Sequence, residues 1–342
     1  MPKHKVAVLF NAEMRAQLYV PQVAQALESF AEPVFQQEQG NLPSERLAET
    51  VGECEAVLTT WGSPGLAAEA LDRTPRLRII AHAAGSIRGI APPEVFARGI
   101  VVTHAAPIIA YYVAESCLGL SIILLRNFVH HDRAMRAQRT LRQAQGRLWG
   151  SPDHRRGDSL FDVRVGLVGL GSVARWFARL LRPFGCEVWA HDPYVAPALA
   201  AELGVKLVAL DELLRGCRVV SVHAANLPQN RHMLGARELA LLPDGCCFIN
   251  TARGALVDHD ALIAELRTGR IQAALDVTDP EPLPADSELR DLPNTVLTPH
   301  IAGPTTAGRW HMAEAMVEEL RRFFAGEPLR YEVTEDRLAS MA

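Results

Sequence analysis

A glycine turn between an apolar run and a helical pattern constrains the fold of this chain more than any other feature. The turn is Gly169-Leu-Gly171-Ser-Val-Ala174, and it follows the apolar run Val163–Gly169. Glycines at these positions permit a tight turn and a close backbone approach. The first N–H groups of the following helix, including those of Ser172 and Val173, can then hold a pyrophosphate. The pattern predicts a nucleotide-binding strand–turn–helix unit.

An acidic residue follows the turn at the spacing typical of a dinucleotide site. Asp192 lies 21 residues beyond Gly171, at the end of the next apolar segment. A carboxylate there accepts hydrogen bonds from the adenosine ribose and repels a 2′-phosphate. The sequence therefore predicts NAD as the cofactor in preference to NADP. The alternative is a glycine turn with an incidental aspartate.

Apolar runs alternate with helical patterns along the chain, which predicts two doubly wound α/β blocks with parallel sheets. A length of 342 residues agrees with about two domains. The first block ends near Pro107, and long helical sequence follows from Val113 to Gln145. The strands expected in the first block are Val6–Phe10, Ala56–Thr60, Leu77–Ala83 and Ile100–Thr103. The helices expected there are Gly65–Leu71, Pro93–Arg98 and Met14–Phe30, the last interrupted near Pro21. The strands expected in the second block are Val163–Gly169, Glu187–Ala190, Val205–Val208, Val219–His223, Cys246–Asn250, Ile271–Asp276 and Val296–His300, before a last helix, Thr305–Ala325, and a tail that could return to the first block.

Composition and charge argue against several classes of protein. A hydrophobic fraction of 49% is ordinary for a globular chain, and a net charge of −4 argues against a dedicated nucleic-acid binder. Eight arginines between Arg126 and Arg156, with Arg133, Arg136, Arg139 and Arg142 on one helical face, lack interleaved stacking aromatics. We therefore favour a solvated or subunit-interface face over nucleic acid.

The sequence also bears on location and metal binding. The longest uncharged apolar stretch near the middle, Ser116–Leu125, is half of what a bilayer requires, so we expect no membrane span. The six cysteines show no Cys-x-x-Cys spacing, which favours reduced thiols over disulfides or metal ligands. We expect a cytoplasmic protein without a metal site.

Three segments after the glycine turn place polar residues at predicted strand ends, where α/β folds bind ligands. They contain Arg253, Glu281 and His300 in turn. A guanidinium, a carboxylate and an imidazole suit hydride transfer to the carbonyl of an acid. The guanidinium binds the substrate carboxylate, the histidine supplies the proton, and the carboxylate orients the histidine and favours its protonated form.

These segments resemble the D-isomer-specific 2-hydroxyacid dehydrogenase family, in the family's order and spacing. The resemblance extends from about Leu77 to Ala325. The motifs that carry it, besides the glycine turn, are Asn250-Thr-Ala-Arg-Gly-Ala-Leu-Val-Asp258, Asp276-Val-Thr-Asp-Pro-Glu-Pro282, Thr298-Pro-His-Ile-Ala-Gly303, Val113-Ala-Glu115 and Trp149.

The resemblance implies an NAD-dependent dehydrogenase of small 2-hydroxy acids that reduces 2-oxoacids in reverse. It implies that Arg253 is the substrate-binding catalytic arginine, His300 the acid/base and Glu281 its partner. It further implies that Asp276 holds the nicotinamide carboxamide. The full set of expected cofactor contacts is Gly169, Gly171, Ser172, Val173, Asp192, His223, Asn230, Thr251, Ala252 and Asp276.

The family's topology implies a discontinuous architecture. A Rossmann-type NAD-binding domain, residues 108–304, would be inserted into a flavodoxin-like substrate domain made of residues 1–107 and 305–342. The site would lie in the cleft and close by hinge motion. Family members are usually homodimers built through the cofactor domain, which gives the long helix and the arginine-rich segment a partner.

The chain departs from the family in its substrate loop. The family usually has an aspartate or asparagine one or two places after the glycine that corresponds to Gly85, where this chain has Ile87 and Arg88. The N–H groups of Gly85, Ser86 and Ile87 can still hold a carboxylate. We expect Arg88 either to add a contact for a phosphate or distal carboxylate or to be a surface arginine. A second departure is Asn230, where the family has a threonine.

Two other functions remain open at this stage. One is a formate- or phosphite-type dehydrogenase, although the formate type pairs its histidine with a glutamine and this chain has Glu281. The other is an NAD(H)-sensing transcriptional co-regulator on the same fold. The identity of the 2-oxoacid does not follow from the sequence.

Overall fold

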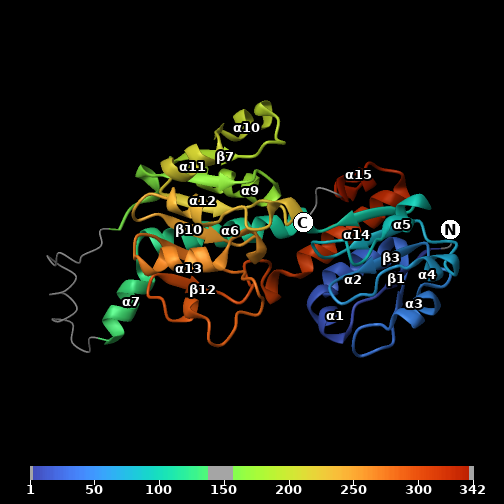
Figure 1. Cartoon of the computed structure of the whole chain (residues 1–342). Helices are drawn as coiled ribbons and strands as arrows, with labels where there is room; N and C mark the ends of the chain where they lie inside the picture. Colours follow the sequence, from blue (N-terminus) through green and yellow to red (C-terminus); the bar gives the residue numbers. More distant parts are fainter. Residues whose placement is uncertain (1–2, 138–156, 339–342) are drawn as a thin grey trace. The chain divides into compact units, whose positions relative to one another are not determined.

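The computed structural model describes residues 3–137 and 157–338, which belong to two compact units (Figure 1). The first unit contains Met1–Ala110 and Pro304–Ala342, and the second contains Tyr111–Gly303. Trp149, Arg139 and Arg142, which the sequence analysis singled out, lie outside the described residues.

The first unit is built on a six-stranded sheet with the order β13-β5-β4-β3-β1-β2. Five strands are parallel, and β13 pairs antiparallel with β5 at one edge. The parallel part has the flavodoxin-like order 2-1-3-4-5. Its strands are β1 (His4–Val8), β2 (Ala31–Phe35), β3 (Ala56–Thr59), β4 (Ile79–His82), β5 (Val101–His104) and β13 (Glu332–Val333).

Helices from both ends of the chain cover this sheet. Met312, Met316 and Leu320 of the C-terminal helix α14 pack in one core cluster with Val6 and Val8 of the first strand, and Figure 1 shows α14 among the N-terminal elements. The helices are α1 (Ala12–Leu18), α2 (Pro21–Phe30), α3 (Ser44–Val51), α4 (Ala68–Asp72), α5 (Pro93–Ala97), α14 (Trp310–Ala325) and α15 (Glu335–Leu338), with a 3-10 turn at Thr306–Gly308.

Proline explains two features of this unit. The helix expected over Met14–Phe30, with an interruption near Pro21, is two helices, because Pro21 begins α2 at a position where its missing N–H costs nothing. Strand β2 was not expected, because Pro33 lies in its middle. It is tolerated there because β2 is an edge strand, with one side unpaired.

The second unit has a seven-stranded parallel sheet with the order β12-β11-β10-β9-β6-β7-β8. Counted from β6, this is the Rossmann order 3-2-1-4-5-6 with one further strand at the edge. The strands are β6 (Arg164–Val168), β7 (Glu187–His191), β8 (Val205–Leu207), β9 (Val219–Val222), β10 (Cys247–Asn250), β11 (Gln272–Leu275) and β12 (Thr295–Leu297). The prediction of two doubly wound parallel-sheet domains is confirmed.

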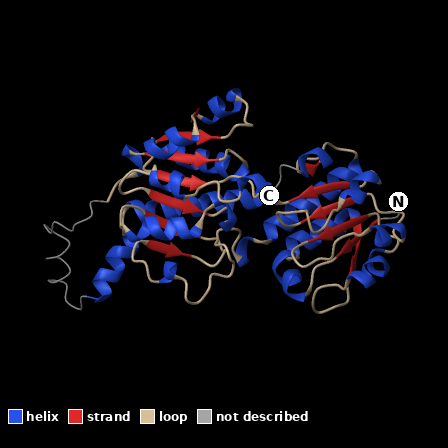
Figure 2. Ribbon diagram, viewed as in Figure 1, coloured by secondary structure: helices blue, strands red, loops and turns tan. Residues whose placement is uncertain are grey.

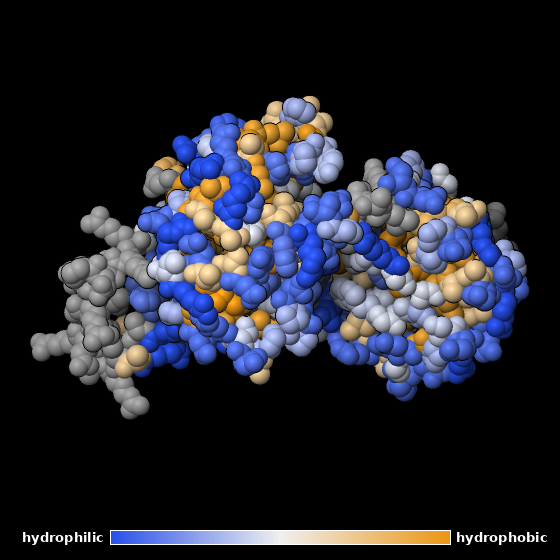
Figure 3. Space-filling view, in the orientation of Figure 1, coloured by the Kyte–Doolittle hydropathy of each residue, from blue (hydrophilic) through white to orange (hydrophobic). Residues whose placement is uncertain are grey.

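Helices lie on both faces of this sheet, as Figure 2 shows in blue against the red strands. The face of the molecule drawn in Figure 3 is mainly hydrophilic, with smaller apolar patches between the polar side chains. The helices are α7 (Phe128–Ala137), α9 (Ser172–Leu181), α10 (Pro197–Leu203), α11 (Leu210–Gly216), α12 (Ala236–Ala240) and α13 (His259–Arg267). The 3-10 turns are Leu160–Asp162, Arg182–Phe184, Pro228–Asn230, Gly254–Leu256 and Glu288–Arg290.

Helix α6 (Ala106–Leu125) begins in the first unit and ends in the second. It has 20 residues, and an 18-residue window within it has a mean hydropathy of 2.0, so by length and composition it could span a membrane. The apolar run Ser116–Leu125 is only part of this helix, which continues through the exposed Glu115. The expectation that no segment spans a membrane stays a prediction. Only 33% of that window is buried within the chain. Core helices of soluble proteins meet the same length and composition criteria, so these criteria do not by themselves identify a membrane span.

One face of α6 packs into the core of the second unit. Its buried residues recur at helical spacing, which places them in a single stripe. They are Ala110, Ala114, Cys117, Leu120, Ser121, Leu124 and Leu125. The long helix expected from Val113 to Gln145 is interrupted at Asn127, which has a φ of 53° and separates α6 from α7.

Candidate functional site

Arg253 lies in the loop after β10. Asn250, at the end of that strand, holds this loop through two hydrogen bonds. Asn250 is fully buried at the strand end. Its Oδ1 accepts the Ala252 N–H at 3.0 Å, and its Nδ2 donates to the Arg253 carbonyl at 2.9 Å. The Arg253 guanidinium donates to the Ala252 carbonyl at 2.6 Å, and no described carboxylate forms an ion pair with it. A guanidinium without a counter-charge is suited to an anionic ligand.

Glu281 lies in the loop after β11, and this loop packs tightly on the loop of Arg253. A Cβ atom at Gly254 would lie 2.0 Å from the Thr278 carbonyl carbon, so only glycine permits this approach. Arg231 also holds the loop, through an ion pair with Asp279 at 3.0 Å. The two loops therefore share one backbone contact next to Arg253.

His300 follows β12 and pairs with Glu281. The distance between His300 Nδ1 and Glu281 Oε1 is 2.5 Å, and the two side chains are 49% and 40% exposed. A carboxylate can only accept, so Nδ1 donates its proton and Nε2 is the nitrogen available to a ligand. The pair thus presents one imidazole nitrogen to solvent with its ring orientation defined.

The loop of His300 is held by Asp276, which is buried at the end of β11. The Asp276 carbonyl accepts the His300 N–H at 2.9 Å. Its carboxylate accepts the N–H groups of Ile301 (2.8 Å) and Ala302 (2.9 Å) and the Thr298 hydroxyl (2.5 Å). These bonds maintain His300 at a φ of 56°, which non-glycine residues seldom adopt. The structure thus gives Asp276 a supporting role in this loop. Its contact with nicotinamide stays a prediction.

The glycine turn has the geometry that a pyrophosphate requires. Gly169 has a φ of 96°, and a Cβ atom there would lie 2.8 Å from the Ala224 nitrogen. The N–H groups of Ser172 and Val173 precede the first hydrogen bond of α9, from Arg175 N–H to the Gly171 carbonyl, so they point out of the helix end. The turn is open on the side of Gly171, where nothing lies within 4 Å of an added Cβ.

Asp192 lies against this turn, as its spacing predicted. One carboxylate oxygen accepts the Leu170 N–H at 2.8 Å, and the other accepts the Tyr194 N–H at 2.9 Å. The side chain is half-buried, so its remaining lone pairs are accessible to a ribose. The structure therefore brings the phosphate-binding and ribose-binding candidates together.

His223, at the end of the neighbouring strand β9, has a buried Nε2 atom with no hydrogen-bond partner among the described residues. Burial lowers the pKa of its imidazole to about 3, so the ring is neutral. An unpaired buried nitrogen beside the glycine turn, together with the open helix end, fits a bound dinucleotide.

The other predicted cofactor residues make internal contacts. The Asn230 amide donates to the Ala225 carbonyl at 2.9 Å and closes its own loop. The Thr251 hydroxyl lies 3.1 Å from the Cys117 sulfur. Their contacts with a cofactor, and that of Ala252, stay predictions. No group of His, Cys, Asp or Glu side chains suited to a metal ion occurs within residues 3–137 and 157–338.

The predicted substrate loop, Gly85 to Arg88, lies in the first unit after β4. Gly85 is half-buried and Ser86 exposed, while the Ile87 side chain is 1% exposed and belongs to the core. Ile87 therefore offers a ligand only its backbone. Arg88 is exposed.

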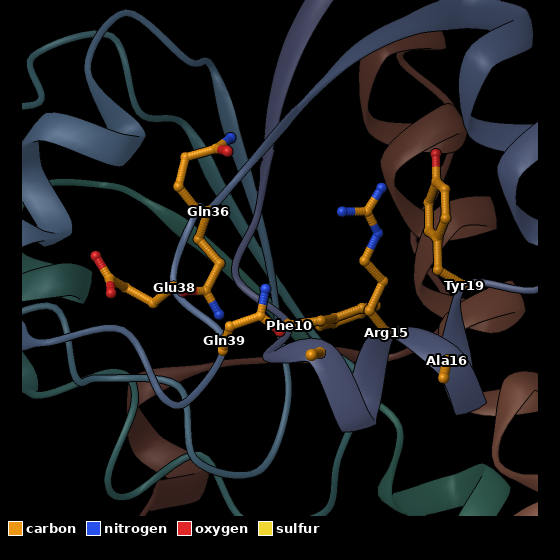
Figure 4. A pocket seen from close by; sticks show the side chains of 9 residues that line it. Phe10, Arg15, Ala16, Tyr19, Gln36, Glu38 and Gln39 are labelled. Carbon is orange, nitrogen blue, oxygen red and sulfur yellow. The ribbon is translucent and has the colours of Figure 1, made fainter.

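A cavity of about 480 Å³ in the first unit holds none of the predicted site residues. In Figure 4, Arg15 and Tyr19 line one side, and Gln36, Glu38 and Gln39 line the other. Its polar groups contact their own neighbours: the Arg15 guanidinium lies 3.8 Å from the centre of the Phe35 ring, and the Tyr19 hydroxyl donates to Glu28 at 3.3 Å. We find no chemistry there that corresponds to the predicted reaction.

Sequence reasoning missed the residues that support the candidate site. Asn250, Gly254 and Thr298 were quoted within motifs but given no role. A buried asparagine at a strand end and a glycine directly after an arginine were the available signals. Asn250 bonds within its own loop, whereas Gly254 and Thr298 contact residues that follow β11, and the sequence does not reveal such contacts between loops.

Comparison with known proteins agrees with this geometry. Residues 118–302 match the sequence model described as "D-isomer specific 2-hydroxyacid dehydrogenase, NAD binding domain". The chain is 33% identical to D-3-phosphoglycerate dehydrogenase of Mycobacterium leprae over 283 residues, which are 82% of this chain but only 51% of that protein. It therefore spans about half the length of that relative.

Two further comparisons cover nearly whole proteins. Glyoxylate reductase of Korarchaeum cryptofilum is 32% identical over 287 residues, 83% of this chain and 84% of that protein. The crystal structure of a phosphoglycerate oxidoreductase from Rhizobium etli matches with a TM-score of 0.81 and 27% identity, and covers 97% of this chain and 99% of that one. The matched domain indicates NAD as the cofactor. By its sequence and its fold, this chain belongs to the D-isomer specific 2-hydroxyacid dehydrogenase family.

Proposed function

We propose that this protein reduces small 2-oxoacids to D-2-hydroxy acids with NADH, and catalyses the reverse oxidation with NAD. The observation that carries the proposal is the His300–Glu281 pair, with its 2.5 Å contact and its solvent-facing Nε2. Arg253, whose guanidinium has no described carboxylate partner, supplies a positive charge from the neighbouring strand end. Both belong to the second unit, with the glycine turn.

In the direction of reduction, NADH held at the glycine turn would supply the hydride that C2 of the oxoacid accepts. Arg253 binds the substrate carboxylate and draws electron density from the 2-oxo group. His300 donates its Nε2 proton to the oxygen as negative charge develops there. Glu281 accepts the Nδ1 hydrogen bond throughout, and so stabilises the imidazolium before transfer and fixes the ring. In oxidation His300 takes the hydroxyl proton at the same nitrogen.

The test is NADH oxidation by the purified protein with a panel of 2-oxoacids that includes glyoxylate, and NAD reduction with D-3-phosphoglycerate. NADPH is measured in parallel. Turnover with NADH and at least one oxoacid supports the proposal. NADH binding without turnover on any substrate would contradict it and favour a regulatory role.

The substrate loop supports a narrower proposal, which concerns the charge of the substrate. We infer that the exposed Arg88 adds a contact for a second anionic group, such as a phosphate. Arg88→Ala should then reduce kcat/KM for dianionic oxoacids more than for monoanionic ones. An unchanged preference would remove this idea.

We further propose a cytoplasmic homodimer built through α6 and α7. Two thirds of the apolar window of α6 is not buried within the chain, and Phe128 and Met135 of α7 are 54% and 41% exposed. A second copy would cover these side chains. Light scattering after size exclusion should give twice the chain mass for the wild type, and Phe128→Asp should shift it toward the monomer. A detergent requirement for solubility would instead favour a membrane-bound α6.

A further inference from the structure

Helix α6 forms hydrogen bonds with the loop after β10 and with the loop after β12. The Ser116 hydroxyl donates to the carbonyl of Ala302, in the loop after β12, at 3.0 Å. The Cys117 sulfur lies 3.1 Å from the hydroxyl oxygen of Thr251, in the loop after β10. Two adjacent residues of one helix therefore bond to both loops that carry the proposed substrate-binding groups. All four residues belong to the second unit.

The contact between Cys117 and Thr251 lies in the core. Cys117 is 0% exposed and Thr251 is 7% exposed. Cys117 belongs to one core cluster with Cys247 and Ile249 of β10, and Figure 1 shows α6 beside that strand. Burial raises the pKa of the Cys117 thiol to about 11, so at neutral pH the thiol keeps its proton and can donate to the hydroxyl oxygen.

This contact completes the attachment of the Arg253 loop. Asn250 bonds to the N–H of Ala252 and to the carbonyl of Arg253, and so holds the later part of the loop. Cys117 bonds to Thr251, the first residue after β10. The bonds from Asn250 come from within the same strand and loop, whereas the bond from Cys117 comes from a helix. Only the second kind of bond relates the loop to another part of the unit.

The Ser116 contact attaches the His300 loop to the same helix. The N–H of Ala302 donates to the Asp276 carboxylate at 2.9 Å, and the carbonyl of Ala302 accepts the Ser116 hydroxyl. Ala302 is 5% exposed and lies two residues after His300. The loop is therefore held by β11 on one side and by α6 on the other.

The chemistry of the proposed substrate gives these two attachments a consequence. The carboxylate and the oxo group of a 2-oxoacid are on adjacent carbon atoms. A guanidinium that binds the first and an imidazole that protonates the second must therefore be held at one separation. Arg253 and His300 come from loops after β10 and β12, and β11 lies between these strands. A helix that bonds to both loops relates their positions directly.

We propose that Ser116 and Cys117 are positioning residues that set the separation of the Arg253 and His300 loops, and so the fit of a 2-oxoacid between the guanidinium and the imidazole. This inference rests on the proposed function for the identity of the ligand. Both residues act through the loops, since their bonds are to Ala302 and Thr251.

The test removes each bond and then restores it. Ser116→Ala and Cys117→Ala remove the bonds, whereas Ser116→Thr and Cys117→Ser retain a hydroxyl. The measurements are kcat and KM for the best oxoacid and the Kd of oxamate, a non-reducible oxoacid analogue, for the NADH-bound protein. Oxamate has a carboxylate beside a carbonyl group, so its binding depends on both loops.

Both alanine variants should raise the oxamate Kd about two- to tenfold, as the loss of one hydrogen bond predicts. Cys117→Ala should act mainly on KM, because Arg253 binds the carboxylate. Ser116→Ala should act mainly on kcat, because His300 transfers the proton. Ser116→Thr and Cys117→Ser should stay close to the wild type in all three quantities.

Ser121→Ala is the matched control. Ser121 is fully buried on the same helix, and its hydroxyl donates to the Cys117 carbonyl at 2.7 Å, within the helix. Its loss should lower the unfolding midpoint but leave kcat, KM and the oxamate Kd unchanged. If Ser116 and Cys117 only stabilise the fold, all three alanine variants will behave like Ser121→Ala, and this result would overturn the inference.

A variant on the loop side covers the case in which Cys117→Ala fails to fold. Thr251→Val removes the hydroxyl that faces Cys117 and keeps the shape of the side chain. It should raise the oxamate Kd to the same extent. A wild-type oxamate Kd in Thr251→Val would overturn the inference.

The oxamate measurements separate this inference from the proposed reaction. A wild type that binds oxamate without turnover of any oxoacid would overturn the proposed reaction alone, and the oxamate Kd values of the variants would still decide the inference. A wild type that turns over oxoacids, with alanine variants that match Ser121→Ala, would overturn the inference alone. A wild type that neither binds oxamate nor turns over oxoacids would overturn both.

Discussion

Asp276 holds His300 by both its backbone and its side chain. The Asp276 carbonyl accepts the His300 N–H, while its carboxylate accepts the N–H groups of the next two residues. A buried carboxylate with this many donors acts as a fixed support for the loop. The orientation of His300 toward Glu281 therefore depends on a residue that bonds to the His300 backbone and to neither of the two reacting side chains.

Asp276→Asn should lower kcat strongly and destabilise the second unit by about 1–3 kcal/mol, because the amide NH₂ would face backbone N–H groups. Thr298→Val is the matched comparison, since it removes only the hydroxyl bond to the same carboxylate. We expect a smaller loss of about 1 kcal/mol from it. Thermal unfolding and kcat measure both variants. Equal effects of the two would contradict the supporting role.

His300→Ala and Arg253→Ala should each retain NADH binding and lose most activity. Removal of a general acid lowers rates by about a hundred- to ten-thousand-fold. The control is His311→Ala, which breaks a histidine–carboxylate contact with Glu314 at 3.6 Å in α14 and should leave kcat unchanged. Fluorescence titration with NADH checks that the cofactor still binds. Activity near the wild-type level in either site variant would refute the assignment.

Gly254→Ala should disturb the geometry of Arg253 and Glu281 together. The added methyl group would overlap the Thr278 backbone, which must move. Overpacking of this kind costs about 1–3 kcal/mol. Gly40→Ala is the control, because nothing lies within 4 Å of the added Cβ. Unfolding midpoints and kcat/KM should fall for the first variant and hold for the second.

Asp192→Ala should relax the selection of NADH over NADPH. The wild-type carboxylate, located beside the glycine turn, repels a 2′-phosphate. We expect the ratio of the two cofactor Kd values to change by about tenfold or more toward NADPH. An unaltered ratio would show that another residue selects the cofactor.

Acidification should destabilise the first unit through His82. The folded-state pKa is about 4, below the unfolded value of about 6.5, so between these values only the unfolded chain binds the proton. This contribution is complete above pH 6.5 and is lost as the pH falls toward 4. From pH 7 to pH 5 it amounts to about 2 kcal/mol. His82→Gln should flatten the pH dependence measured by calorimetry.

The fold class followed from the sequence because strands buried on both faces read as apolar runs between helical patterns. Edge elements were harder to predict. Strand β2 contains Pro33, and β13 is two residues long, so neither has a pattern of its own. Helix α6 was underestimated because one exposed glutamate interrupts an otherwise apolar face.

The candidate site, too, could be predicted from the sequence only in part. Asp192 lies at the glycine turn and Glu281 beside His300, as their positions after parallel strands indicated. The contacts of Asp276 with the His300 loop and of Gly254 with the Thr278 backbone could not be predicted, since they depend on how loops from different strands pack together. Sequence motifs identify reactive groups, whereas the bonds that orient them form only in three dimensions.

The Arg253, Glu281 and His300 loops follow three adjacent strands of one sheet, and all three residues belong to the second unit. The proposed acid–base groups and the predicted cofactor contacts therefore come from one contiguous stretch of the chain. Residues 83–88 belong to a different unit. Mutant libraries that vary only this loop would therefore search for new oxoacid preferences and leave Arg253, Glu281 and His300 unchanged.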